Sequence, residues 1–113
     1  MQPRGTCFID AFNLLSDRAA NSNLRLVHGY VTSRRSDGNR YRHSHAWVED
    51  LDTGLVLDYA NGGRNCIACD KYYNSLSITR TVTYTSEEAS IKMLQTEHYG
   101  PWEDWLEEGE KLA

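Results

Sequence analysis

Two short polar turns in the first half of the chain constrain its fold more than any other feature. The first contains Asp37-Gly38, a dipeptide that favours a tight turn between antiparallel strands, and the second is Asp52-Thr53-Gly54. The segments around these turns read as strands: the first alternates in its side chains with a period of two, and the last begins with the apolar run Leu55-Val56-Leu57. We therefore expect an antiparallel meander of three strands. These strands are expected at residues 24–33, 41–49 and 55–58.

A helix is expected before this meander. One apolar stripe with helical spacing predicts it over about residues 6–20, and Thr6 stands where an N-cap is expected. The members of the stripe are Phe8, Ala11, Phe12, Leu15 and Ala19. The order of helix, strands and later helices predicts the α+β class, with the N-terminal helix packed on an antiparallel sheet.

The second half of the chain carries weaker patterns. Residues 59–74 read as a loop, and residues 78–84 read as a strand. Thr85-Ser86-Glu87-Glu88 fits a capping box, which predicts a helix to about Thr96. Pro101 then predicts a short C-terminal helix with one apolar stripe. That stripe would be formed by Trp102, Trp105 and Leu106.

Size and charge narrow the class of protein. The 113 residues suit one domain, so we expect a single domain over residues 1–113. A net charge of −4 argues against wholesale binding to nucleic acid or to a membrane surface. No apolar run approaches the ~20 residues that a membrane-spanning helix needs. The first four residues lack the apolar stretch of a signal peptide, so we expect a cytoplasmic protein.

Cys7 stands where the first helix is expected to begin. A thiol attacks as its thiolate, and the free N–H groups of a first helical turn stabilise that negative charge. The same donors can stabilise the oxyanion of a tetrahedral intermediate. Gly5 leaves room for a close approach of the backbone. The alternative is that Cys7 is a small apolar residue packed beside Phe8.

His45 and Asp58 could supply the base and the group that orients it. On the expected second strand, His45 shares a face with Trp47, which would shield the imidazole from water. Pairing through the second turn would place Val48 opposite Leu55 and His45 opposite Asp58. A carboxylate there could fix the imidazole tautomer. The competing residues are His43 as the base and Asn61 as the orienting group; Asp58 could also simply begin a turn.

A cysteine at a helix start, His-Ala-Trp-Val-Glu on a strand and Val-Leu-Asp on the next strand resemble the papain-like and transglutaminase-like cysteine-hydrolase superfamily. The match covers roughly residues 2–58. The resemblance implies a helix carrying the cysteine, packed on a sheet that carries the histidine and the aspartate. Cys7 would be the nucleophile, His45 the general base and acid, and Asp58 the orienting residue.

The resemblance also implies an activity. The chain would be a small hydrolase or acyltransferase that needs no cofactor or metal and acts on an amide, isopeptide or thioester bond. Its substrate would be a protein, a peptide or a small amide. Gln2, five residues before Cys7, would be an oxyanion donor, and Trp47 would adjoin the substrate. The chain is shorter than typical papain-type proteases and has no second lobe, so a general protease is not expected.

Other interpretations stay open at this stage. The same fold could serve as a non-catalytic binding or inhibitory module. Cys66 and Cys69 form a CxxC that, with His43 and His45, could hold zinc; the pair could also be a redox dithiol or two packed loop cysteines. A basic loop could bind an acidic substrate or form a solvated hairpin tip. Its members are Arg34, Arg35, Arg40 and Arg42.

Overall fold

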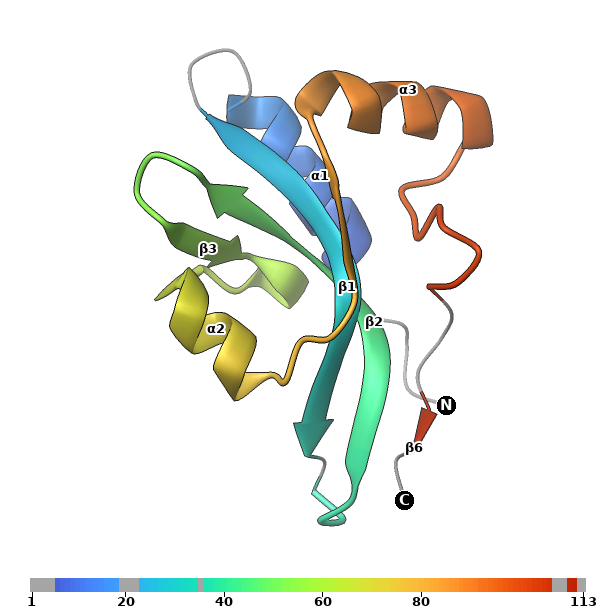
Figure 1. The fold of residues 1–113 in the computed structure, drawn as a ribbon. Helices are drawn as coiled ribbons and strands as arrows, with labels where there is room; N and C mark the ends of the chain where they lie inside the picture. The colour runs from blue at the N-terminus through green and yellow to red at the C-terminus, as the bar shows by residue number, and fades with distance from the viewer. Residues whose placement is uncertain (1–5, 19–22, 35, 107–109, 112–113) are drawn as a thin grey trace.

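The computed structural model describes residues 6–18, 23–34, 36–106 and 110–111 (Figure 1). It is an α+β fold, as the sequence predicted: an N-terminal helix, an antiparallel sheet and further helices. The first elements are α1 (Cys7–Arg18), β1 (Leu24–Arg34), β2 (Arg40–Asp50), β3 (Leu55–Asp58) and the 3₁₀ turn η2 (Ala60–Gly62). They are followed by β4 (Asn65–Ala68), α2 (Cys69–Ser75), β5 (Thr81–Tyr84), α3 (Ser86–Thr96) and β6 (Glu110–Lys111).

The sheet has the strand order β4-β3-β2-β1-β5, and the short β6 pairs with the first part of β2. Every pairing is antiparallel. The three strands of the predicted meander are confirmed to within one residue at each end. Gly38 and Gly54 have φ of 84° and 72°, a left-handed conformation that glycine adopts without strain. These two glycines allow the tight turns that the sequence indicated.

The register between β2 and β3 differs from the prediction. Val48 lies opposite Leu57, two residues away from the expected Leu55. The reason is a loop of four residues: Asp50 pairs with Leu55, and the Asp50 carbonyl accepts the Gly54 N–H at 2.9 Å. A shift of two residues keeps every side chain on its face of the sheet. His45 and Asp58 therefore still share a face, but they lie diagonally across the strands.

The two faces of the sheet carry separate cores. Between one face and helices α1 and α3 lies the larger core. Its buried residues are Ala11, Phe12, Leu14, Leu15, Leu26, Ala46, Val48, Leu57, Tyr84 and Ala89. The other face is covered by α2 and packs a smaller cluster, Val27, Val31, Trp47, Val56 and Tyr72. His45 belongs to this second face, because it alternates with Ala46 and lies in step with Trp47.

Two predictions for the second half of the chain are wrong. Residues 59–74 contain η2, β4 and most of α2 instead of a loop, and β4 forms an edge of the sheet. The C-terminal helix is absent: the described residues 101–106 form only bends and a turn. Trp102 and Trp105 anchor this segment at different sites, on His28 and on Tyr30, and such separate anchors favour an irregular path.

The other predictions for this region fared better. The capping box is present, with Thr85 accepting from the Glu88 N–H and Glu88 accepting from the Thr85 N–H. The strand expected at 78–84 is shorter: β5 covers Thr81–Tyr84, and before it Thr79 and Arg80 hydrogen-bond Tyr30 of β1 without forming part of the strand. In the described part of the chain, no helix has the length and apolar character needed to cross a membrane.

Candidate active site

Cys7 is the first residue of α1, and only 8% of it is exposed. The helix begins directly after Thr6, whose carbonyl accepts the Asp10 N–H at 2.8 Å. The Thr6 hydroxyl donates to the Asp10 carboxylate at 2.5 Å, which ties the first turn together. The N–H groups of a first turn have no partners within the helix, so the Cys7 sulfur lies at its electropositive end.

His45 lies in β2 with 15% of its side chain exposed. Its Nε2 is 3.0 Å from Oδ2 of Asp58, and Cys7 is close enough to raise the pKa of the imidazole. Burial of the ring opposes protonation, but the hydrogen bonds to Asp58 and Cys7, with the negative charges of both groups, raise the pKa of His45 to about 9. The imidazole is therefore held as a cation beside the Asp58 carboxylate.

Asp58 is the last residue of β3, and 14% of its side chain is exposed. Oδ2 contacts His45 and accepts the Tyr72 hydroxyl at 2.7 Å, while Oδ1 accepts the Ala60 N–H at 3.1 Å. Burial would raise the pKa of Asp58, but these hydrogen bonds and the charge of His45 lower it below its ordinary value. Asp58 is thus a fixed anion on the far side of the imidazole from Cys7.

The end of β3 explains how residues from one helix and two strands meet. The pairing of β2 with β3 stops at Val48 and Leu57, three residues beyond His45 along β2. The helix α1 packs against β2 and η2 there. Cys7 is close enough that its charge raises the pKa of both His45 and Tyr72. The three residues predicted from the sequence are therefore brought together.

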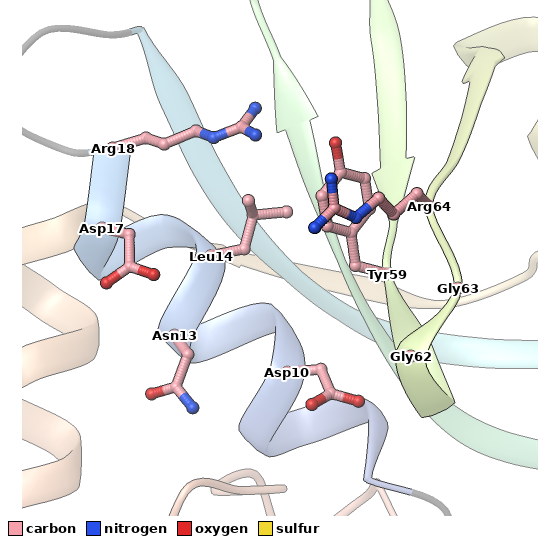
Figure 2. A pocket seen from close by; sticks show the side chains of 9 residues that line it. All are labelled: Asp10, Asn13, Leu14, Asp17, Arg18, Tyr59, Gly62, Gly63 and Arg64. Carbon is pink, nitrogen blue, oxygen red and sulfur yellow. The ribbon is translucent and has the colours of Figure 1, made fainter.

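A hollow of about 370 Å³ lies between α1 and the segment that follows β3 (Figure 2). Asp10, one helical turn after Cys7, is in its wall, as is Tyr59, which follows Asp58 directly. The complete lining is Asp10, Asn13, Leu14, Asp17, Arg18, Tyr59, Gly62, Gly63 and Arg64. Cys7, His45 and Asp58 do not themselves line the hollow, which runs along α1; its nearer end is at Asp10, one helical turn after Cys7.

Tyr72 is a member of the site that the sequence did not reveal. It lies in α2, is 2% exposed and packs its ring 5.4 Å from that of Trp47. Burial and the hydrogen bond to Asp58 raise the pKa of the hydroxyl, so it remains a donor. In the sequence it is one half of Tyr72-Tyr73, within a segment expected to be a loop. The Tyr72 hydroxyl reaches Asp58 because this segment forms the helix α2.

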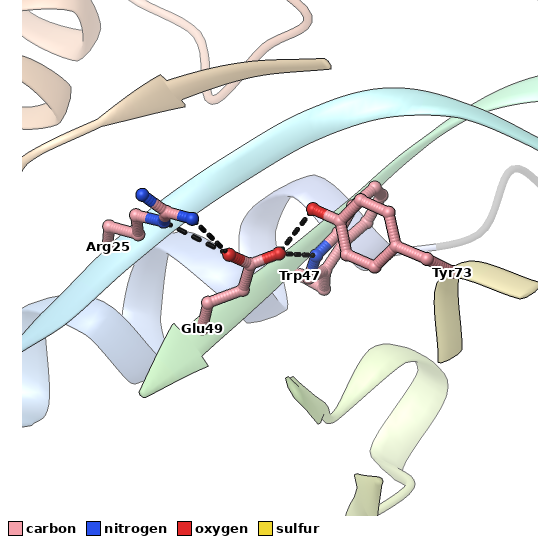
Figure 3. Close-up of polar contacts among 4 residues, drawn as sticks. All are labelled: Arg25, Trp47, Glu49 and Tyr73. Atoms are coloured by element: carbon pink, nitrogen blue, oxygen red, sulfur yellow. Dashed lines mark hydrogen bonds and ion pairs between the residues drawn. The ribbon is translucent and has the colours of Figure 1, made fainter. Parts of the chain in front are cut away.

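Trp47 lies beneath His45 and is fully buried. The imidazole stacks on its indole, with ring centroids 6.0 Å apart and an angle of 29°. The indole N–H donates to Oε2 of Glu49 at 3.1 Å, and the Tyr73 hydroxyl donates to the same oxygen (Figure 3). Arg25 donates to Oε1 of Glu49 at 3.0 and 2.7 Å. Trp47 is therefore a fixed support for His45, away from the surface.

Gln2 and Arg35, and the side chain of Asn61, are outside the described residues. The ring of His43, the competing base of the sequence analysis, lies 6.0 Å from that of His45.

Cys66 is exposed on β4, and Cys69 begins α2. Burial and the charge of Glu49 raise the pKa of the Cys69 thiol, which disfavours a reactive thiolate there. Among the residues that the structure describes, no group of three or more histidine, cysteine or acidic side chains is arranged to hold a metal ion.

Comparisons of the chain with protein-family models, with curated proteins and with solved structures found no match. The chemistry of the site must therefore be inferred from its own geometry.

Proposed function

We propose that the chain is a small cysteine hydrolase or acyltransferase that acts on an amide, isopeptide or thioester bond. The observation that carries this proposal is the meeting of Cys7, His45 and Asp58: His45 hydrogen-bonds Asp58 at 3.0 Å, and Cys7 is close enough to raise the pKa of His45. The cysteine stands at a helix N-terminus, the imidazole is shielded, and the carboxylate is fixed by two further donors. Nucleophile, base and orienting group thus stand in the order that acyl transfer requires.

The first half of the reaction forms a thioester. Because Nε2 of His45 is occupied by Asp58, Nδ1 is the nitrogen available to Cys7. The thiolate attacks the substrate carbonyl carbon, and the resulting oxyanion accepts hydrogen bonds from backbone N–H groups at the start of α1, with Gln2 as a further donor. The tetrahedral intermediate collapses when Nδ1 of His45 gives its proton to the leaving amine.

The second half releases the acyl group. Neutral His45 takes a proton from water, the hydroxide attacks the thioester carbon, and the carboxylic acid leaves while Cys7 regains its starting state. An amine in place of water gives acyl transfer by the same steps. Asp58 stabilises the imidazolium in both halves, and Tyr72 holds Asp58 in place.

A second candidate function is a non-catalytic binding or inhibitory module on this fold. The observation that favours it is the burial of Cys7, of which only 8% is exposed. An attacking thiol must be reached by its substrate. The two functions differ in whether an external electrophile reaches the Cys7 sulfur.

The test is the pH dependence of alkylation by iodoacetamide, resolved for each cysteine by mass spectrometry. If the proposal is correct, Cys7 reacts well below pH 8 and ahead of Cys66 and Cys69. The His45→Ala variant should lose this advantage by roughly 10²-fold near pH 6, the usual scale of a catalytic base. His43→Ala is the matched control, because it removes the neighbouring imidazole and leaves the contact with Asp58 intact.

Inert Cys7, or equal reactivity in the wild type and His45→Ala, would overturn the enzymatic proposal in favour of the binding module.

A further inference from the structure

The hollow along α1, whose nearer end is one helical turn after Cys7, is electrically polarised. At the end nearer Cys7 its wall carries the Asp10 carboxylate, which the Thr6 hydroxyl already contacts. At the other end Arg18 and Arg64 extend toward each other above Leu14 (Figure 2). These two residues come from different elements, the last turn of α1 and the segment after η2. The far end of the hollow is therefore positive.

Two converging guanidinium groups form a site for an anion. Arg64 is exposed and, within the described part of the chain, has no hydrogen-bond or ion-pair partner. Arg18 lies over the Tyr59 ring, 5.7 Å from its centroid, which holds its guanidinium group above the hollow. Asp17 is directed away from both groups in Figure 2 and pairs with neither. The planar fork of arginine matches a carboxylate, which could bridge the two side chains.

The wall opposite α1 suits the backbone of an extended peptide. Gly62 and Gly63 present no side chains to the hollow. A Cβ built on Gly62 would meet no atom within 4 Å, so the space above it is open. Its φ of 81° is a conformation that glycine adopts without strain. A substrate chain can therefore approach this wall closely.

The length of the hollow sets a distance between the reacting carbonyl and the anion. Arg18 follows Cys7 by eleven residues, which is ~16 Å along a helix axis. Side chains on a helix lean toward its N-terminus, so the guanidinium group is nearer to Cys7 than its own Cα is. About three or four extended residues, at ~3.5 Å each, span that gap.

We propose that the hollow binds a peptide substrate with a carboxylate three or four residues from the bond attacked by Cys7, and that Arg18 and Arg64 bind this carboxylate. This inference rests on the proposed function and names the substrate class of the same site. Two sources share the chemistry: the C-terminal carboxylate of a short peptide, and an acidic side chain within a longer one.

The experiment uses iodoacetyl-capped oligoglycines of one to six residues, ending in either a free carboxylate or an amide. The quantity measured is the second-order rate of Cys7 alkylation. We expect the carboxylate series to exceed the amide series by roughly tenfold at three or four glycines, the gain from one charge-assisted contact, and to match it at one glycine. Arg64→Gln and Arg18→Gln should each abolish the maximum, with the amide series measured on the same variant as the reference. Arg40→Gln, at an exposed guanidinium of the hairpin, should keep it.

A ratio of carboxylate to amide that is independent of length, or a maximum that survives Arg64→Gln, overturns the proposal. Probes ending in an aspartyl amide identify the source: activity equal to that of the free carboxylate assigns an internal acidic side chain, and lower activity assigns a chain terminus.

The rate with plain iodoacetamide distinguishes a failure of this proposal from a failure of the proposed function. If Cys7 does not react with iodoacetamide, the proposed hydrolase function is wrong. The carboxylate site is then tested separately, by titrating tetraglycine into the protein and following the amide resonances of Gly62 and Gly63. Shifts that disappear in Arg64→Gln retain the carboxylate site, and unchanged resonances remove it.

Discussion

His28 and His45 are the same residue type on neighbouring strands, and the sheet gives them opposite chemistry. Gly29, next to His28, pairs with His45, so the two histidines lie on opposite faces. His28 is fully buried among the rings of Phe8, Tyr84 and Trp102, and burial lowers its pKa to about 3. Burial also opposes protonation of His45, 15% of whose side chain is exposed, but Asp58 and Cys7 raise its pKa to about 9. Burial alone therefore keeps an imidazole neutral, whereas hydrogen-bonding and acidic partners allow a buried imidazole to hold a proton.

The surroundings of His28 leave its ring nitrogens nothing to bind. Among the described residues, neither Nδ1 nor Nε2 has a hydrogen-bond partner. Gly100 closes the cage: its φ is 117°, and a Cβ there would lie 2.6 Å from Cε1 of His28. The neutral imidazole thus acts as a core aromatic group. The cage abuts Phe8, the residue after Cys7, so it also steadies the start of α1.

The largest expected effect comes from removing the buried neutral histidine. In the unfolded chain His28 becomes protonated as the pH falls below 6.5, whereas in the folded protein its pKa is about 3. Lowering the pH from 6.5 to about 3 therefore favours the unfolded state, and the stability of the wild type falls. Between pH 7 and pH 4 this loss is about 3 kcal/mol. The His28→Leu variant should not show it. Urea unfolding of both proteins at the two pH values gives the difference, and equal losses would mean that His28 is not held neutral.

A smaller effect is expected from the support beneath His45. Arg25→Met leaves the Glu49 carboxylate buried without its two guanidinium donors. Breaking such a pair is destabilising, and because 40% of the Arg25 side chain is exposed we expect about 2 kcal/mol. Thermal unfolding measures this change. Arg40→Met is the matched control. A similar loss of stability in both variants would mean that the contacts of Arg25 with Glu49 do not stabilise the fold.

The smallest effect is expected at Tyr72. Tyr72→Phe removes one of the hydrogen bonds to Asp58 and should cost about 1 kcal/mol of stability. Asp58 then holds the imidazolium less firmly, so we expect the pH profile of Cys7 alkylation to move toward that of His45→Ala. The profile is the informative measurement. Lower stability with an unmoved profile would make Tyr72 a packing residue only.

The periodic half of the chain was predictable because local rules decide it. The strand patterns within residues 24–58 and the glycines of the two turns predicted the meander, and the face shared by His45 and Trp47 follows from the period of two. The register was wrong by two residues because loop length, not strand pattern, sets it. The prediction of which face carries His45 was unaffected, because a register shift of two residues leaves each side chain on the same face of the sheet.

The rest depends on contacts between distant segments. Tyr72 becomes a partner of Asp58 only through α2, which the sequence pattern did not indicate. Trp102 and Trp105 have helical spacing, yet each is held by a different strand residue, His28 and Tyr30. The burial of His28 could not be predicted from the sequence either, because Gly100 and Trp102, which contact it, come from the far end of the chain.

The most direct measurement is the titration of the four imidazoles by NMR, in the wild type and in Cys7→Ala. We expect His45 to titrate with a midpoint near 9 and His28 to stay neutral down to about pH 4. In Cys7→Ala the midpoint of His45 should fall, because one of its anionic partners is gone. A wild-type midpoint at or below 6.5 for His45, or one that Cys7→Ala leaves unchanged, would contradict the pairing of Cys7 with His45.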